Sequence, residues 1–395
     1  MINKRSDQIS IDDFKELITY EISESRTLEY KSELHIASGD ERKEFLADVS
    51  SFANSIGGDL IFGIREDENH HPTELCGIEC EDTDELIRQI DSLIRDSISP
   101  RISGIEIKTF LVLKNHFILL IRIAKSYLSP HRVTYKGYDK FFSRNSGGKF
   151  PMDVNDLRVA FNMTQNITEK ASSFISDRIN FLLDNSYSIF ENNQALFLMH
   201  LIPLSSFDYN NIRTISEIKN TVANSRCTTF GTYTQPICNI DGVIQSIKGS
   251  HKNSSYTEYY KNGIVETVTS RFFNPSFEAP CFPPLELKII YKQDIVAYTI
   301  QSLKEYIEYF KLLDCPTPLL LSVSLINVMD YTICNQFYDA PSKIDRNILH
   351  ISEVIIDSYD EKAESILRPV FDSIWNSCGY DACSAYDKQG KYIWK

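Results

Sequence analysis

The chain has 395 residues, of which 42% are hydrophobic, and this length and composition describe a globular protein with room for two domains. No apolar run approaches the roughly 18 residues that a membrane-spanning helix needs, and the polar opening MINKRSDQIS differs from a signal peptide. We therefore expect a soluble, cytoplasmic protein that has no membrane partner. The nine cysteines lack the CxxC spacing of zinc ribbons and redox sites, which indicates small buried or free thiols.

The formal net charge of −13 disfavours a nucleic-acid partner, because a polyanion attracts positive surfaces. The charge is unevenly distributed, however. Residues 1–100 contain 10 basic and 24 acidic residues, whereas residues 101–150 contain 10 basic and only 2 acidic residues. The basic stretch is either a solvated face or a polyanion-binding site that lies beside an acidic one.

The first elements along the chain are a helix and a strand. Residues 9–22 place apolar side chains at helical spacing after Ser10, a favourable N-cap, and so predict a short leading helix. Residues 27–31, TLEYK, alternate in polarity and predict a half-buried strand. Glu29 shares one face of that strand with Lys31, and we expect its side chain to point away from the core.

A second helix and a buried strand follow. Residues 41–56 carry one apolar stripe behind a capping-box pattern, and Gly57 suits the position just after a helix end. Residues 60–64 predict a strand buried on both faces, which ends in the charged corner REDE. Residues 70–79 then predict a turn and a short strand.

The region up to residue 150 continues with a helix and a hairpin. Residues 83–98 predict an amphipathic helix with Thr83 as its N-cap, and the alternating runs 105–113 and 116–124 predict an antiparallel hairpin. Basic residues on and after the hairpin are interleaved with aromatic ones, as on surfaces that contact phosphates and stack bases, although a strand pair with an aromatic core looks similar. Six basic side chains are the candidate nucleic-acid contacts: Lys31, Arg122, Arg132, Lys136, Arg144 and Lys149.

The second half of the chain has its own pattern of strands and helices. A helix begins at residues 153–162, and the polar stretch NMTQNITEKASS predicts the boundary between a domain of residues 1–165 and one of residues 170–395. We expect a mixed sheet with helices in the second domain, and the fold class is therefore α+β. The predicted elements are strands at 195–204, 318–328 and 348–357, an Asn-Gly hairpin within 256–273, and helices at 294–313 and 364–379.

Three carboxylates, those of Glu24, Glu29 and Glu66, are the candidates for chemistry. An oxygen-only ligand set suits a hard divalent cation such as Mg²⁺ or Mn²⁺. Glu24 and Glu29 face opposite ways on a regular strand, so they converge only if the chain bends at Ser25-Arg26. The alternative is that all three are solvated acids at strand ends. We expect the adjacent His70-His71 pair to be exposed to solvent rather than bound to a metal.

The opening ESRTLEYK, the helix end SFANSIGG, the strand LIFGI with its corner RED, and the later segment FFSRNSGG resemble the Schlafen-type AlbA_2 domain family over about residues 20–150. In the nuclease branch of that family, two acids of the opening motif and one acid after the Gly-Gly strand form a metal-binding triad that cleaves RNA. The resemblance assigns these catalytic and metal-binding roles to Glu24, Glu29 and Glu66, with Asp67 as a neighbour that could substitute. It also implies a phosphate contact at His131-Arg132.

The function that this resemblance implies is a metal-dependent endoribonuclease with Mg²⁺ or Mn²⁺ as its cofactor and RNA favoured over DNA. The implied setting is stress response or defence against foreign genetic elements. Two alternatives stay open. The first is a non-catalytic nucleic-acid-binding or regulatory protein. The second is an assembly or sensor protein whose N-terminal acids are structural and whose C-terminal domain binds a protein partner or a second copy of the chain.

Overall fold

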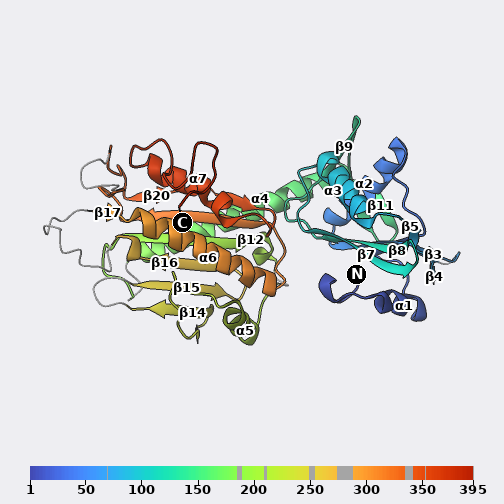
Figure 1. Ribbon diagram of the computed structural model, residues 1–395, viewed down its shortest axis with the longest axis horizontal. Coiled ribbons are helices and arrows are strands. Elements are labelled where there is room, and N and C mark those ends of the chain that lie inside the picture. The colour runs from blue at the N-terminus through green and yellow to red at the C-terminus, as the bar shows by residue number, and fades with distance from the viewer. Residues whose placement is uncertain are drawn as a thin grey trace. The chain divides into compact units, whose positions relative to one another are not determined.

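The computed structural model describes residues 1–68, 70–184, 189–208, 211–248, 254–273, 288–333, 341–351 and 353–394. The chain divides into two compact units, Met1–Ile167 and Thr168–Lys395 (Figure 1). Each unit combines helices with sheets, which confirms the α+β class. Across the described residues, no helix has both the length and the apolar character needed to cross a lipid bilayer.

Helix α4 (Val154–Leu183) continues through the division between the two units. The polar stretch of residues 162–173 lies within this helix. Its Asn, Thr and Ser residues resemble a loop in composition, but it contains neither glycine nor proline, so no residue in it interrupts a helix strongly. The change from one unit to the other therefore takes place without a break in secondary structure.

A mixed five-stranded sheet lies at the centre of the N-terminal unit, in the order β1-β2-β8-β5, with β7 paired to β8. Strands β1 and β2 are parallel and the other described pairs are antiparallel. Every residue of β2 is buried, as predicted for a strand covered on both faces. The strands of this sheet are β1 (Leu28–Lys31), β2 (Gly57–Phe62), β5 (Ile78–Glu79), β7 (Ile105–Leu113) and β8 (His116–Ala124).

The two faces of this sheet pack into separate cores. Leu60 and Phe62 of β2 belong to a cluster with α2 and α3, whereas Ile61 belongs to a cluster with Phe14 of α1. A four-stranded sheet, ordered β11-β10-β9-β6, and the hairpin β3-β4 complete the unit. The remaining elements are α1 (Ile11–Thr19), α2 (Gly39–Ala53), α3 (Thr83–Ser97), β3 (Ile64–Glu66), β4 (Pro72–Leu75), β6 (Ile98–Ser99), β9 (Arg132–Tyr135), β10 (Tyr138–Asn145) and β11 (Gly148–Pro151).

The helix starts follow local side-chain chemistry. The predicted N-cap of α1, Ser10, is confirmed, and so is the capping box before α2, in which Ser38 Oγ accepts from the backbone N–H of Glu41 at 3.2 Å. The expected N-cap of α3 is wrong by one residue. Asp82 takes that position instead of Thr83, because its carboxylate reaches the third N–H of the helix at 2.9 Å.

Gly57 has a different role from the one predicted for it. Helix α2 ends at Ala53, and Gly57 begins β2 with φ +76°. A Cβ atom at this position would lie 2.6 Å from the backbone nitrogen of Lys125. The position therefore requires glycine both for its left-handed backbone and for the close approach of the chain that follows β8.

An eight-stranded sheet forms the centre of the C-terminal unit, in the order β13-β14-β15-β16-β12-β18-β20, with β21 paired to β18. All of its described pairs are antiparallel. The expectation of a mixed sheet in this unit is therefore wrong. The predicted Asn262-Gly263 turn joins β15 to β16. Its strands are β12 (Leu196–Pro203), β13 (Ile237–Cys238), β14 (Gly242–Ile247), β15 (Ser255–Tyr260), β16 (Val265–Thr269), β18 (Leu319–Ile326), β20 (Ile348–His350) and β21 (Val354–Ile356).

The helices α5 (Ile215–Ser225), α6 (Lys292–Leu312) and α7 (Ala363–Asn376) contribute to one apolar core with the odd-numbered residues of β12. Because side chains alternate along a strand, His200 of β12 lies on the opposite face of the sheet. There it contacts Glu266 of β16, which is also bound by Arg178 of α4. A short parallel pair, β17 (Ile289–Ile290) and β19 (Thr332–Ile333), lies outside the main sheet.

Candidate functional site

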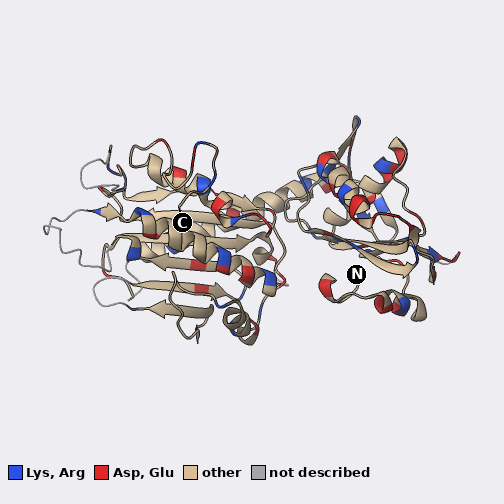
Figure 2. Cartoon of the chain, in the orientation of Figure 1, with Lys and Arg blue, Asp and Glu red and all other residues tan. Residues whose placement is uncertain are grey.

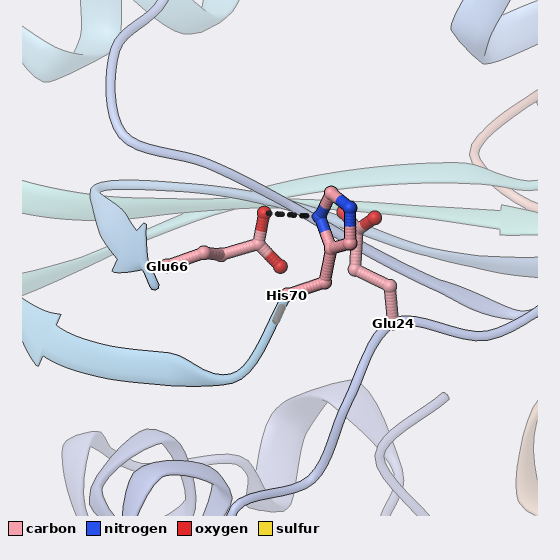
Figure 3. Close-up of side chains that lie close together, drawn as sticks. All are labelled: Glu24, Glu66 and His70. Atoms are coloured by element: carbon pink, nitrogen blue, oxygen red, sulfur yellow. Dashed lines mark ion pairs between the residues drawn. The ribbon is translucent and has the colours of Figure 1, made fainter. Parts of the chain in front are cut away.

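Three polar side chains converge beside the start of β1. They are Glu24, which precedes β1, Glu66 at the end of β3, and His70 in the turn between β3 and β4. One ligand atom from each residue lies within 4.8 Å of the others, and Nδ1 of His70 is 3.9 Å from Oε2 of Glu66. Figure 3 shows the three side chains pointing toward one another. Two of the three predicted carboxylates are thus brought together, and a histidine joins them.

A tight turn positions Glu24 for this arrangement. Ser25 and Leu28 exchange backbone hydrogen bonds of 2.9 and 3.2 Å, which reverses the chain just before β1. Oε1 of Glu24 then accepts a hydrogen bond of 2.8 Å from the backbone N–H of Tyr30. The sequence required a bend at Ser25-Arg26 if Glu24 was to meet Glu29; the bend is present, but it places Glu24 beside Glu66 and not in a cluster with Glu29.

Within the cluster, Glu66 is the carboxylate whose pKa is raised. Burial and the nearby charge of Glu24 raise the pKa of Glu66 to about 7, although His70 and Lys31 oppose the shift. Its Oε1 atom is buried and has no hydrogen-bond partner. Burial, together with the charges of Glu66 and Glu24, also raises the pKa of the Tyr30 hydroxyl. The site is therefore short of positive charge.

Glu29 does not lie in this cluster. Its side chain was expected to face solvent, but β1 is covered on both faces, and Glu29 is only 8% exposed. Oε1 lies 2.7 Å from Nζ of Lys31, and Oε2 lies 2.7 Å from Nη2 of Arg144. Although burial opposes the shift, these two cations hold the pKa of Glu29 below its usual range. Each carboxylate oxygen of Glu29 already has a cationic partner.

A buried ion-pair network extends from Glu29 into α2. The guanidinium of Arg144 lies 3.7 Å above the ring of Phe52 and is 3% exposed. Lys149 bonds Asp48 at 2.6 Å and also pairs with Glu44. Burial and the charge of Glu29 raise the pKa of Asp48 to about 6, although Lys149 opposes the shift. Lys31, Arg144 and Lys149, three of the predicted nucleic-acid contacts, thus make ion pairs within the unit.

The guanidinium of Arg122 also forms its contacts within the N-terminal unit. Its Nε and Nη2 atoms lie 2.8 and 2.9 Å from the two carboxylate oxygens of Asp59. The same guanidinium donates to the backbone carbonyls of Ile2 and Lys4 at 2.9 and 2.5 Å. This bidentate clamp holds the first residues of the chain against β2 and β8.

Two predicted contacts, Arg132 and Lys136, are exposed, and the side chain of Lys31 is 40% exposed although it pairs with Glu29. Arg132 is exposed on β9 and lies 3.6 Å from Asp139, and Lys136 is exposed in the turn before β10, with its ammonium 5.4 Å from the ring of Tyr135. His131, in contrast, is fully buried, and its ring bonds the carbonyl of Pro100 and the hydroxyl of Ser126. Basic and acidic positions are interspersed over this unit in Figure 2.

His70 is the member of the cluster that sequence reasoning placed in solvent. Its side chain is indeed 74% exposed, but it is directed at Glu66, four residues earlier. The neighbouring His71 bonds Ser23 instead, with Nδ1 2.9 Å from Oγ. The sequence offered one signal for this contact, namely that His70 follows Glu66 by four residues. That spacing brings the two side chains together only for a turn of this length.

Residues 24–153 match the model of the family described as Schlafen, AlbA_2. No curated protein matches the chain. A crystal structure of the DIP2311 protein from Corynebacterium diphtheriae is 19% identical, with a TM-score of 0.24 over 35% of this chain and 30% of that one. A solution structure of the N-terminal domain of a RecG-related protein from Nitrosomonas europaea is 18% identical, with a TM-score of 0.24 over 30% of this chain and 74% of that one. Residues 24–153, all within the N-terminal unit, thus match the Schlafen AlbA_2 family model, and this match points to a function related to nucleic acids.

Proposed function

We propose that the N-terminal unit is a metal-dependent endoribonuclease in which Glu24 and Glu66 hold a divalent ion, Mg²⁺ or Mn²⁺. The observation that carries this proposal is the convergence of these two carboxylates from separate segments of the chain. The donor set fits such an ion, because Glu66 has a buried oxygen without a partner and the neighbouring Glu24 adds a second negative charge. When bound, the ion polarises a phosphoryl oxygen and activates a water molecule.

The protein's own residues supply orientation and shielding in this proposal. Tyr30 holds Glu24 in place through its backbone N–H, and the tight turn at residues 25–28 keeps that carboxylate beside β3. Arg132 and Lys136 are the exposed cations that we assign to the phosphate backbone of RNA. By the same family resemblance, we place the activity in stress response or in defence against foreign genetic elements.

The ion pairs of Glu29 bear on whether the unit cleaves nucleic acid or only binds it. In nuclease members of the family the equivalent acid is a metal ligand, whereas here Lys31 and Arg144 neutralise it. This observation favours, as a second candidate, a unit that binds nucleic acid without cleaving it. In that case Glu24 and Glu66 are dispensable for binding.

The first prediction concerns cleavage. The full chain is incubated with structured RNA and either Mn²⁺ or Mg²⁺, as wild type and as Glu66→Gln. We expect the wild type to cleave and Glu66→Gln to be slower by about 100-fold, because the variant loses a charged ligand. Glu68→Gln, which removes the same charge from an exposed position two residues later, should retain wild-type activity.

Equal cleavage rates for the wild type and Glu66→Gln contradict the catalytic assignment. If neither protein cleaves with either ion but both bind RNA with equal affinity, the non-catalytic candidate is correct. Measuring binding and cleavage on the same RNA therefore separates the two candidate functions.

The second prediction concerns RNA binding. Arg132→Glu should weaken RNA binding by about tenfold at low ionic strength, and the difference should shrink as salt is added, because phosphate contacts release counterions. The matched control is Lys15→Glu, which makes the same kind of charge reversal at an exposed position of α1. Fluorescence anisotropy with a labelled RNA measures both. Equal effects of the two variants would show that only overall charge matters.

A further inference from the structure

The ligand set at the candidate site differs from three carboxylates in one respect. Glu29 is held by Lys31 and Arg144, and the imidazole of His70 is the third potential ligand beside Glu24 and Glu66. The group thus offers two carboxylate oxygens and one ring nitrogen (Figure 3). Ring nitrogens and carboxylate oxygens differ in the metal ions that they prefer, so this difference has chemical consequences.

The turn between β3 and β4 determines where the imidazole lies. The backbone N–H of Asp67 donates to the carbonyl of His71 at 3.0 Å, and that of His70 donates to the carbonyl of Asp67 at 3.1 Å. The Asp67 carboxylate also accepts from the backbone N–H of His71 at 3.0 Å. These bonds close the turn immediately after Glu66 and bring His70 back toward that carboxylate, where its Nδ1 lies 3.9 Å from Oε2.

The spacing of the three groups suits one ion. Nitrogen and carboxylate ligands lie roughly 2.0–2.2 Å from a small divalent metal ion, so ligands on opposite sides of it are about 4 Å apart. The ligand atoms of Glu24, Glu66 and His70 lie within 4.8 Å of one another, slightly wider than this span, so small side-chain rotations bring all three onto one ion. The Oε1 atom of Glu66, which is buried and accepts no hydrogen bond, is a second observation that points to a ligand beside this carboxylate.

We propose that His70 is the third protein ligand of the divalent ion held by Glu24 and Glu66, and that its imidazole makes the site select a transition-metal ion over Mg²⁺. The inference rests on the metal site of the proposed function and goes beyond it in naming a ligand and a metal class. Imidazole nitrogen binds first-row transition-metal ions well, whereas Mg²⁺ prefers oxygen ligands and gives up its water reluctantly. In this assignment the ring binds the ion through Nδ1, the atom that faces Glu66.

Metal binding to the full chain tests this inference without any RNA. Mn²⁺ and Mg²⁺ are titrated separately by calorimetry into the wild type, His70→Ala, His71→Ala and Glu66→Gln. We expect the wild type to bind Mn²⁺ at least about tenfold more tightly than Mg²⁺, and His70→Ala to lose that preference by weakening Mn²⁺ binding alone. His71→Ala, which removes the adjacent ring that bonds Ser23, should behave like the wild type.

A spectroscopic measurement distinguishes direct ligation from a structural effect. Pulsed electron paramagnetic resonance of the Mn²⁺ complex should show nitrogen modulation from a bound imidazole in the wild type and in His71→Ala. That modulation should disappear in His70→Ala. A modulation that persists in His70→Ala overturns the assignment of His70, whatever its effect on affinity.

The outcomes also separate this inference from the proposed function. If Glu66→Gln abolishes Mn²⁺ binding but His70→Ala changes neither affinity nor spectrum, the site exists and the role of His70 is wrong. If Glu66→Gln binds Mn²⁺ as the wild type does, the metal site itself is wrong and both proposals fail. Selective loss of the Mn²⁺ preference in His70→Ala supports both.

Discussion

Glu266→Gln is expected to lower the free energy of unfolding of the C-terminal unit by about 3–5 kcal/mol, the cost of breaking a buried ion pair on one side. Glu266 is fully buried on β16. Its carboxylate accepts from Arg178 at 2.8 and 2.9 Å, from Nε2 of His200 at 2.8 Å and from the hydroxyl of Tyr256 at 2.6 Å. The substitution keeps the shape of the side chain but leaves the guanidinium of Arg178 with only the more distant carboxylate of Glu258, 3.9 Å away, as its charge partner.

The same group makes stability depend on pH. Although burial opposes the shift, His200 and Arg178 lower the pKa of Glu266 from 4.5 to about 2. A folded-state pKa below the unfolded value means that the stabilisation is complete above about pH 4.5 and is lost as pH falls toward 2. By linkage, this group contributes roughly 3 kcal/mol over that interval. Glu266→Gln should lack this part of the pH dependence.

Urea unfolding followed by tryptophan fluorescence measures this prediction. The chain contains two tryptophans, Trp375 and Trp394, and both belong to the C-terminal unit. Glu308→Gln, which alters an exposed carboxylate on α6, is the control and should change stability by less than about 0.5 kcal/mol. An unchanged midpoint for Glu266→Gln at pH 7 contradicts the prediction.

Arg144→Met is expected to destabilise the N-terminal unit by about 3 kcal/mol. Arg144 was predicted from the sequence to contact nucleic acid, but its guanidinium is buried between Glu29 and the ring of Phe52. Methionine keeps much of the apolar contact with Phe52 and removes the charge. Glu29 is then left with Lys31 alone, beside the buried carboxylate of Asp48.

A double variant separates charge from packing. Replacing both partners, as Glu29→Leu with Arg144→Met, should recover most of the stability, because an apolar pair needs no charge compensation. Hydrogen exchange of the buried strand β2 reports on this unit, and the fluorescence of the two tryptophans should stay unchanged as an internal control. If Arg144→Met is as stable as the wild type but binds RNA more weakly, Arg144 acts as a nucleic-acid contact instead.

Several features of the fold could be predicted because neighbouring residues determine them. The capping box at Ser38, the apolar stripe of α2 and the Asn262-Gly263 turn depend on contacts within a few positions along the chain. The burial of β2 followed from its unbroken apolar composition. The errors at Gly57 and at the start of α3 were shifts of a few residues, since several residues there satisfy the same local rule.

The candidate site could be predicted only in part. The convergence of Glu24 with Glu66 followed from the family resemblance, whereas the bend before β1 was expected to bring Glu24 to Glu29 and does not do so. The burial of Glu29 did not follow, because alternation along β1 shows that two faces exist but does not show that the second face is covered. His70 was missed because a short polar turn carries no pattern that fixes the direction of a side chain.

Thus the sequence by itself determined the order of most helices and strands, the α+β class, the match of residues 24–153 to the Schlafen AlbA_2 family and two of the three residues that meet at the site, because these depend on local periodicity and on a continuous motif. The tertiary structure alone decided which basic side chains are paired within the protein and which are exposed to a partner. Arg122 bonds Asp59, Arg144 bonds Glu29, and Lys149 bonds Asp48, in each case across a long stretch of chain. The energy of a charge depends on the groups that surround it in space, and no count of basic residues along the chain contains that information.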